Sequence, residues 1–491
     1  MIPILTKSQA YQLDKSTIES GISSQEELMD NAGFSLACHI LENTPNPFNT
    51  QILVIVGKGN NGGDGIITHH YLTKWGCKSK LMFIDEEIKN SFLLGKYNIL
   101  EKSYFIYDST IKITDYDLII DGILGIGISR KLDKKMTEII NKVNLCENIY
   151  SIDIPSGLFC DSGKIKENSI LARQTHTMGY PKLGQFINDG LNAVGFLQIH
   201  DIGFPEFSPI IYSLIEEEDI EINIKLPHVD SHKYSKGKLV VIGGSVEYIG
   251  ALELASNAGY RSGAGYVKAL VPSEIKNVIN NKIPELIVNS ISKQNIENAV
   301  KWGDAFVIGP GLNIDKNDFQ NILNVIKISD KPVVIDASAL NFIGSEVSIN
   351  DFPLRTIFTP HKGELIYLSQ NIKTNFNLQP VEFLDELIEN LGNRYCLIKG
   401  QPNYLVNPDG TINLMNHGTP TLSTAGTGDV LAGLIGGLLS QGYSEQNAMI
   451  VGTWIHAESA LIFAENFGAI GMIATDLLEF IPSAFEKYLV D

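Results

Sequence analysis

The sequence predicts an α/β protein of two successive domains, each built on a largely parallel sheet. The chain has 491 residues, whereas one domain commonly takes about 150. Short apolar runs rich in β-branched residues alternate with helix-like stretches in both halves, which is the pattern of a parallel sheet with crossover helices. These runs end in glycine or polar residues, and ligands of such sheets bind beyond the carboxyl ends of the strands.

An acidic run separates the two halves. Residues 216–221 have the sequence EEEDIE, and Leu226-Pro227 follows, where proline interrupts regular secondary structure. We therefore predict a first domain over residues 1–223 and a second domain over residues 224–491.

The core of the first domain is expected to open with a helix. Ser24 and Glu27 form a capping-box pattern, and apolar residues recur every four positions from Leu28 to Ile40. The strands expected after it are QILVIV, KLMFID, DLIID and YSIDI, and the helices follow Gly65, surround residues 93–100 and begin at Thr137. The second domain repeats the pattern with the buried strands KLVVIGG, AFVIGPG, PVVIDA and YCLIKG.

Composition and charge exclude several classes of protein. An apolar content of 44% supplies two sizeable cores, so disordered and fibrous proteins are excluded. The 38 basic and 56 acidic residues leave a formal charge of −18, and acidic residues outnumber basic ones in both halves. This charge repels phosphate backbones and anionic lipids, so we expect neither a nucleic-acid partner nor a membrane partner.

Other features favour the cytoplasm. The start of the chain lacks a secretory signal pattern, and the longest apolar stretch, near Val430 to Leu439, is shorter than the ~20 residues of a membrane helix. The five cysteines are scattered and include no C-x-x-C pair, so neither a disulfide framework nor a zinc site is expected.

The first candidate site is the loop GKGNNGGDG over residues 57–65. Its five glycines lie between an expected strand and an expected helix, where backbone amides can approach a phosphate. The loop loosely satisfies G-x-G-x-x-G, with Asp85 as a possible ribose ligand at the end of the next strand. A tight strand-to-helix turn without a ligand is the alternative.

Two further strand ends carry polar residues, in DGILGIG over residues 121–127 and in DIPSG over residues 153–157. Carboxylates at neighbouring strand ends can bind a cation or act as acid and base. Helix capping and turn formation explain the same residue types equally well when each motif is taken singly.

Together these motifs resemble the YjeF N-terminal domain family, a Rossmann-like fold known as the NAD(P)HX epimerase. The resemblance covers essentially residues 1–223, and it implies Asp153 as the acid/base for proton transfer at the hydrated nicotinamide ring. The substrate-binding residues that it implies are Asn60, Asn61, Gly62, Gly63, Asp64, Gly125, Ile126, Gly127, Ile128, Ser129, Arg130, Lys131 and Asp153, and the implied potassium ligands are Asn61, Asp121 and Ser156.

The second candidate site is the segment STAGTGDVLAG over residues 423–433. Its glycines open an apolar helix, and the free amides and the helix dipole favour an anion there. Asp429 lies at the same place, where it can take a proton from a hydroxyl that attacks a bound phosphoryl group. An ordinary helix N-cap is the alternative. The chain contains no G-x-x-x-x-G-K-[ST], which disfavours a Walker-type nucleotide site.

AGTGDVLAG resembles the anion-hole motif of the ribokinase-like superfamily, and a series of further motifs follows the order of the YjeF C-terminal domain, the ADP-dependent NAD(P)H-hydrate dehydratase. The resemblance spans about residues 224–491. Besides HK, GGS and GA after the boundary, the motifs are RSGAG at 261–265, GPGL at 309–312, DASAL at 336–340, TPHKGE at 359–364 and KG at 399–400.

The second resemblance implies phosphorylation of the hydrate, with Asp429 as the base, and loss of phosphate to restore NADH or NADPH. Magnesium is expected to bridge the phosphates of ADP, with Glu364 as an indirect ligand. The implied hydrate-binding residues are Ala251, Gly311, His361 and Asp429, and the implied nucleotide-binding residues are Lys399, Gly400, Gln401, Pro402, Asn403, Gly426, Thr427 and Gly428.

Three positions depart from the family pattern. Ala425 replaces the first glycine usually found before G-T-G-D, Ser338 replaces an acid, and Lys362 stands where proline is frequent. These changes retain the expected base and anion loop, but they leave the phosphate donor and the metal ligands open.

Our leading hypothesis is a bifunctional repair enzyme for hydrated nicotinamide dinucleotides. Because enzymes of this family commonly form homo-oligomers, we expect a homo-oligomer. The first half epimerises the R and S hydrates, and the second half dehydrates the S form with ADP. The alternatives are a ribokinase-like kinase for a small alcohol, and a first half that is a non-catalytic binding module.

Overall fold

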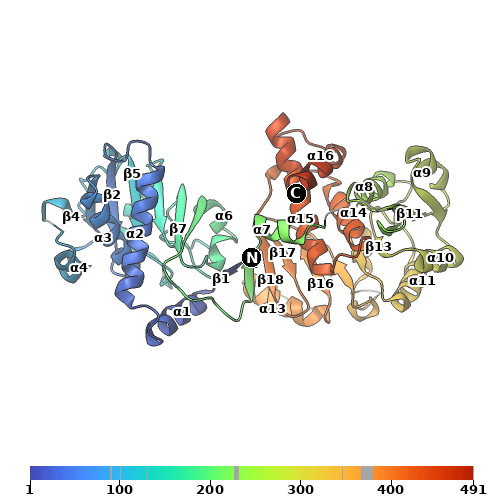
Figure 1. The fold of residues 1–491 in the computed structure, drawn as a ribbon, viewed down its shortest axis with the longest axis horizontal. Coiled ribbons are helices and arrows are strands. Elements are labelled where there is room, and N and C mark those ends of the chain that lie inside the picture. The colour runs from blue at the N-terminus through green and yellow to red at the C-terminus, as the bar shows by residue number, and fades with distance from the viewer. Residues whose placement is uncertain are drawn as a thin grey trace. The chain divides into compact units, whose positions relative to one another are not determined.

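The computed structural model describes residues 1–88, 91–99, 101–129, 131–225, 232–344, 347–365 and 380–489. Contacts divide the chain into two compact units, one over Ile2–Tyr212 and one over Met1 with Ser213–Asp491 (Figure 1). The acidic run forms helix α7 (Glu217–Asn223) of the second unit, where Asp219 accepts a hydrogen bond of 2.5 Å from the Met1 ammonium. The domain boundary near residue 223 stays a prediction.

The first unit consists of a seven-stranded parallel sheet and its crossover helices. Its sheet order is β4-β3-β2-β5-β6-β7-β8, and this order reverses between β2 and β5. Its elements are β1 (Ile2–Ile4), α1 (Lys7–Glu19), α2 (Gln25–Asn43), β2 (Gln51–Val56), α3 (Asn60–Lys74), β3 (Lys78–Phe83), α4 (Ser91–Lys96), β4 (Tyr104–Ile106), β5 (Leu118–Gly122), α5 (Lys134–Val143), β6 (Ile149–Ile152), β7 (Gln174–Met178), α6 (Gly190–Ala193), β8 (Phe196–His200) and β9 (Tyr212–Leu214), of which β9 continues into the second unit.

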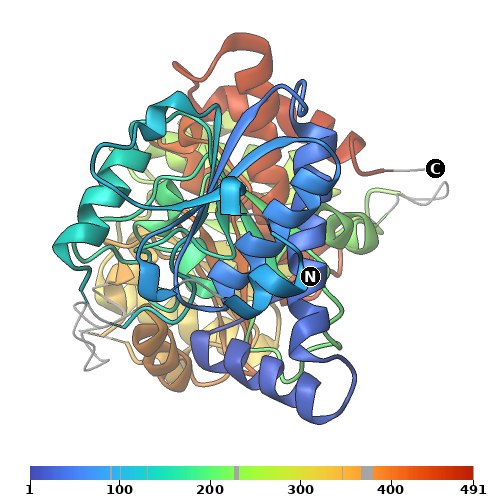
Figure 2. The same cartoon turned by 90° about the vertical axis from the view of Figure 1, so that its left-hand side faces the viewer.

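Helices cover both faces of this sheet (Figure 2). Along β2, Val54 packs in one apolar core with residues of α2 and α3, whereas Leu53 packs in another core with residues of α5. Alternate side chains of a strand point to opposite faces, so a strand buried on both faces is apolar throughout, as QILVIV is.

The second unit is built on a larger, doubly wound sheet that contains both parallel and antiparallel pairs. From β9 onward its order is β9-β18-β17-β16-β15-β14-β13-β10-β11-β12, and the order reverses between β10 and β13. Its remaining elements are β10 (Lys238–Ile242), α8 (Ile249–Arg261), β11 (Tyr266–Val271), α9 (Lys276–Lys282), β12 (Ile287–Ser290), α10 (Lys293–Trp302), β13 (Ala305–Ile308), α11 (Lys316–Ile326), β14 (Val333–Ile335), β15 (Thr356–Phe358), α13 (Pro380–Leu391), β16 (Tyr395–Ile398), β17 (Asn403–Val406), β18 (Ile412–Met415), α14 (Thr427–Ser440), α15 (Glu445–Phe467) and α16 (Ala474–Glu486).

Close backbone packing joins α14 to α8 in this unit. A Cβ on Gly433 would lie 2.1 Å from the carbonyl oxygen of Ala255, and one on Gly437 would lie 1.9 Å from the Ser262 Oγ. Both distances are far below contact distance, so glycine at these positions lets the two helices approach each other.

The predicted fold class is confirmed. The expected runs form β2, β3, β5 and β6 in the first unit and β10, β13, β14 and β16 in the second, and Ser24 caps α2 with a capping box. Some helix starts differ from expectation. Helix α3 already begins at Asn60 inside the glycine loop, α5 begins at Lys134 instead of Thr137, and α1 precedes the helix that was expected to be first. None of the helices in the described ranges combines the length and apolarity that a membrane span requires.

Candidate active sites

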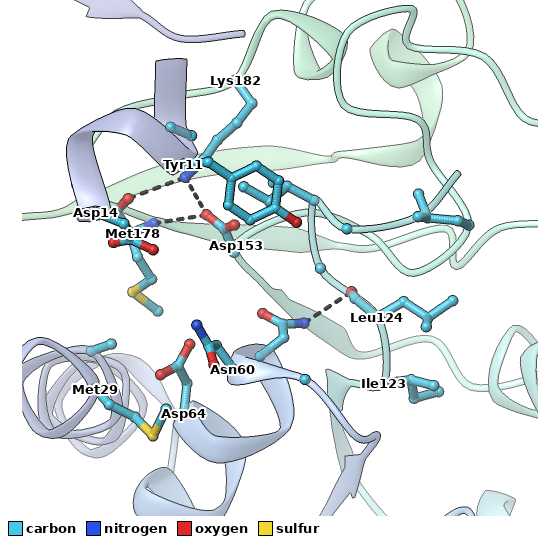
Figure 3. Close-up of a pocket in the computed structure, with 18 of the residues that line it drawn as sticks. Tyr11, Asp14, Met29, Asn60, Asp64, Ile123, Leu124, Asp153, Met178 and Lys182 are labelled. Carbon is cyan, nitrogen blue, oxygen red and sulfur yellow. Dashed lines mark hydrogen bonds and ion pairs between the residues drawn. The ribbon is translucent and has the colours of Figure 1, made fainter. Parts of the chain in front are cut away.

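A cavity of about 680 Å³ lies at the carboxyl ends of the strands of the first unit (Figure 3). Its lining comes from the first turn of α3, the segments after β5 and β6, the end of β7, and helix α1. The cavity therefore lies where the strand order reverses, which is the usual ligand position of a doubly wound sheet.

The glycines of the first loop have different roles. A Cβ on Gly57 would lie 1.9 Å from the Ile123 carbonyl oxygen, and one on Gly62 would lie 2.1 Å from the Gly57 carbonyl oxygen. Close packing thus requires glycine at these two positions, as the turn alternative supposes. Gly59, in contrast, has open space around it and lines the cavity, and no side chain caps the amides of α3 there.

Most of the expected substrate residues of this unit line the cavity, but not all. Asn60, Asn61, Asp64 and Asp153 do so, as do the described residues of the loop, which are Gly125, Ile126, Gly127, Ile128, Ser129 and Lys131. Arg130 lies outside the described residues. Gly62 and Gly63 do not line the cavity; a Cβ on Gly63 would lie 2.5 Å from the Met29 sulfur.

The expected potassium ligands lie together. The buried Asp121 accepts hydrogen bonds from the Ser156 Oγ at 2.6 Å, the Ser156 amide at 2.9 Å and the Ser151 Oγ at 2.9 Å. Burial raises the pKa of Asp121, although these donors favour its ionised form.

Asn61 completes this group and has a free acceptor. Its side-chain nitrogen Nδ2 donates to the Leu124 carbonyl at 3.0 Å. Its side-chain oxygen Oδ1 is buried and has no hydrogen-bond partner among the described residues. A buried polar atom without a partner is costly, and a carbonyl-type oxygen is a natural ligand of a hard cation. The residues present therefore fit a potassium ion.

Asp153 follows β6 and adopts a left-handed backbone conformation, with φ 62°. Its carboxylate forms an ion pair with the buried Lys182 and accepts hydrogen bonds from the Thr177 Oγ1 at 3.2 Å and the Met178 amide at 3.3 Å. The left-handed region is uncommon for a residue other than glycine and is concentrated at functional sites.

Lys182 and Asp14 are among the polar residues of this cavity that sequence reasoning missed. The available signal for Lys182 was its position shortly after the polar run QTHTM, which forms β7. Asp14 projects from α1, which was not expected. Burial raises the pKa of Asp14, and the nearby Asp153 raises it further while Lys182 lowers it.

The base expected in the second unit lies at the start of a helix. Asp429 is in the first turn of α14, and Gly426 caps that helix in a left-handed conformation with φ 92°, which glycine adopts without strain. Burial raises the pKa of Asp429 to about 7, and the carboxylates of Asp336 and Glu364 contribute to the rise while Lys399 opposes it.

Lys399 follows β16 and joins the polar residues of this second site. Its ammonium donates to the Asp336 Oδ1 at 2.7 Å and lies 4.0 Å from the Glu364 Oε2. Burial lowers the pKa of Lys399, but the two carboxylates outweigh this effect and raise it above its usual value. Sequence reasoning quoted Asp336 within DASAL without a role, although its place at the end of β14 was the signal.

His361 and Gly428 adjoin Lys399, and Gly311 adjoins Ala251. His361 is bridged to Lys399 across the sheet, and its amide donates to the Glu364 Oε2 at 2.9 Å. A Cβ on Gly311 would lie 3.1 Å from the Ala251 Cβ, so these two residues lie side by side. A Cβ on Gly428 would lie 3.4 Å from the Lys399 ammonium.

The nucleotide-binding residues expected in the loop after β16 form a turn. The Gly400 amide donates to the Asn403 Oδ1 at 3.1 Å, and Gln401 donates to the Asn416 Oδ1 at 2.9 Å. Pro402 follows Gln401 in a cis peptide bond, and Thr427 opens α14 with its hydroxyl donating to the Leu422 carbonyl at 3.0 Å.

The fold and the two groups of residues define a chain with a Rossmann-like unit followed by a ribokinase-like unit. Residues 25–184 match the family described as the YjeF-related protein N-terminus, and residues 239–483 match the family described as NAD(P)H-hydrate dehydratase. A solved ribokinase-like superfamily protein from Enterococcus faecalis matches with a TM-score of 0.51 and 24% identity, over 58% of this chain and 99% of that one.

Full-length relatives combine the same two parts. The bifunctional NAD(P)H-hydrate repair enzyme Nnr of Dictyoglomus turgidum is 32% identical, and the match covers 94% of each chain. The enzyme of that name from Escherichia coli is 29% identical over 89% of this chain and 86% of its own. The chain belongs to the family of bifunctional NAD(P)H-hydrate repair enzymes, which confirms the family and the enzyme class that the sequence predicts.

Proposed function

We propose that the first unit interconverts the R and S hydrates of NADH and NADPH, and that the second unit dehydrates the S hydrate with ADP. The observation that carries the first activity is Asp153, an ion-paired carboxylate facing a cavity of about 680 Å³. The observation that carries the second is Asp429, a carboxyl poised to ionise near neutral pH at a glycine-rich helix start.

In the first unit Asp153 transfers a proton at the hydrated ring. Lys182 and the Thr177 hydroxyl hold one of its oxygens, which fixes the carboxylate in one position. A positioned acid or base of this kind accelerates a reaction by roughly 100- to 10,000-fold. The loop from Gly125 to Lys131 and the Asn60 amide side chain hold the rest of the dinucleotide.

The first unit also has residues that would hold a potassium ion. Asn61, Asp121 and Ser156 would hold the ion, and a bound cation supplies positive charge next to an anionic dinucleotide. The unpartnered Asn61 oxygen supports this assignment.

In the second unit Asp429 takes the proton of the ring hydroxyl while the hydroxyl oxygen attacks the terminal phosphorus of ADP. The bond between that phosphorus and the leaving AMP oxygen breaks. The amides of Gly426 to Gly428 hold the transferred phosphoryl group at the helix start. The ring nitrogen then expels phosphate, a far better leaving group than hydroxide, and loss of a proton restores the reduced dinucleotide.

The remaining residues of the second unit bind the two ligands. Lys399 to Asn403 contact the adenine nucleotide, and Ala251, Gly311 and His361 contact the hydrate. No group of three His, Cys, Asp or Glu residues in the described part of the chain is arranged to hold a metal. Magnesium would therefore rely on the phosphates of ADP, with Glu364 as an indirect ligand.

The test uses the purified chain with separated R and S hydrates, with and without ADP. We expect the S hydrate to give NADH only when ADP is present, and the R hydrate to equilibrate with the S form without any nucleotide. Phosphorylation of a small alcohol without formation of NADH would instead establish the kinase alternative. Failure of the R form to equilibrate would favour a non-catalytic first unit.

The homo-oligomeric state and the cytoplasmic location stay predictions.

A further inference from the structure

Asp64 is a second carboxyl that lines the cavity of the first unit, and the proposed function gives it no catalytic role. It lies in the first turns of α3, and none of the hydrogen bonds or ion pairs of the described residues reaches its carboxyl group. Figure 3 shows Asp64 and Asp153 pointing into the cavity from different elements, α3 and the end of β6. A ring bound between them is accessible to one carboxyl on each side.

Three charged residues surround the carboxyl group of Asp64. Asp14 on α1 and Asp153 face it, together with Lys182, whose ammonium is engaged by Asp153. The other charged residues that line the cavity are Lys58, Lys131 and Asp133. Burial and the two neighbouring carboxylates raise the pKa of Asp64 well above its usual value, so this carboxyl holds its proton to higher pH than an ordinary aspartate does.

We propose that Asp64 is a second catalytic residue of hydrate epimerisation, a general acid that acts from the side of the ring opposite to Asp153. This role rests on the proposed function of the first unit. Two carboxyls that reach one cavity from different elements can serve as the acid and the base of one site.

The reaction exchanges the ring hydroxyl for a water oxygen. The carbon that carries the hydroxyl is bonded to the ring nitrogen, whose lone pair forms a C=N bond as the C–O bond breaks. The departing oxygen keeps its electron pair and takes the proton of Asp64, so that one water leaves. A second water attacks the other face of the same carbon, and its proton passes to the Asp153 carboxylate.

The proton balance closes over successive turnovers. The forward reaction leaves Asp64 ionised and Asp153 protonated, and the reverse epimerisation uses the same two groups in exchanged roles. Proton exchange with solvent through the cavity restores the starting state as well. One hydrate enters, the inverted hydrate leaves, and one water is released for each water consumed.

The first experiment compares the wild type with Asp64→Asn, which keeps the shape of the side chain but has no acidic proton. We expect R–S interconversion to slow by about 100-fold or more, with ADP-dependent dehydration of the S hydrate unchanged. Interconversion by the variant at the wild-type rate would overturn the role of Asp64. If the wild type itself fails to interconvert the hydrates, the proposed function of the unit fails instead.

A second variant decides the matter if Asp64→Asn does not fold. The negative charge of Asp14 raises the pKa of Asp64, so Asp14→Asn lowers that pKa. Because the acid must be protonated, the alkaline limb of the epimerisation pH profile then moves to lower pH. A purely structural change lowers the rate without moving this limb, and an unmoved limb overturns the proposal.

Epimerisation in water enriched in a heavy oxygen isotope tests the bond that breaks. We expect one solvent oxygen to enter the hydrate for each inversion, measured by mass spectrometry of the separated R and S forms. Inversion with retention of the original oxygen would mean that the ring opens at the C–N bond, and the proposed step would be wrong.

Discussion

Asp429 combines burial, two neighbouring carboxylates and one ammonium within the second site. These surroundings raise its pKa to about 7, close to the pH at which a general base works most efficiently. A carboxyl with an ordinary pKa would be ionised but a weak base, and the buried position strengthens it.

The pH dependence of dehydration follows from this value. Asp429 must be ionised to accept a proton, so the rate with the S hydrate and ADP is expected to rise through about pH 7 and level off above it. At pH 6 about one tenth of the base is ionised, because the pH is one unit below the pKa. A rate that is constant between pH 5 and pH 8 would contradict the assignment.

The variant Asp336→Asn tests which way the surrounding charges move the pKa of Asp429. Its carboxylate raises the pKa of Asp429, and its removal also leaves the charge of Lys399 less compensated. Both effects lower the pKa of Asp429, so the acid limb of the profile is expected to move to lower pH. The measurement is the dehydration rate against pH for both proteins, and a shift to higher pH would refute the charge arrangement.

The packing of helix α8 against helix α14 positions residues of the second site. Ala251 lies near the start of α8 and Asp429 near the start of α14, and Gly433 and Gly437 bring the two helices into backbone contact. The distance between Ala251, the proposed hydrate-binding residue, and Asp429, the proposed base, is therefore set by glycines that lie more than one helical turn from Asp429.

Gly433→Ala tests this packing. The added methyl group would meet the Ala255 carbonyl at 2.1 Å, so we expect a loss of about 1–3 kcal/mol in the free energy of unfolding and a slower dehydration. Gly250→Ala is the matched control, because its Cβ meets no atom within 4 Å. Denaturant unfolding of the two variants should differ; equal stability would show that the helices are not closely packed.

The sequence predicted elements and motif residues better than contacts between them. Apolar runs followed by glycine or Asp identify strands and their functional ends, because burial on both faces and ligand position are local properties of a strand. Lys182 and Asp153 meet across 29 residues, and Lys399 and Asp336 across 63. No local pattern signals such pairs, since only the order of strands in the sheet brings them together. Helix α1 was missed although the capping box of Thr6 and Gln9 was a local signal for its start.

At the scale of the whole molecule, a chain with a formal charge of −18 binds dinucleotides that are themselves anionic. Because acidic residues outnumber basic ones, we expect the phosphates to be bound locally by helix starts, glycine-rich loops and single lysines. The first unit offers the start of α3, and the second offers the start of α14 with Lys399. The two units act in sequence on one metabolite, because the S hydrate that the first forms is the substrate of the second.

The most direct test of this account is the rate of NADH formation from the pure R hydrate with ADP, in the wild type, Asp153→Asn and Asp429→Asn. We expect the wild type to convert the R hydrate and Asp429→Asn to form no NADH. Asp153→Asn should form NADH only as fast as the R hydrate epimerises spontaneously, while it converts the S hydrate at the wild-type rate. Mixing the two variants should restore conversion of the R hydrate. Conversion of the R hydrate by Asp153→Asn at the wild-type rate would contradict the account.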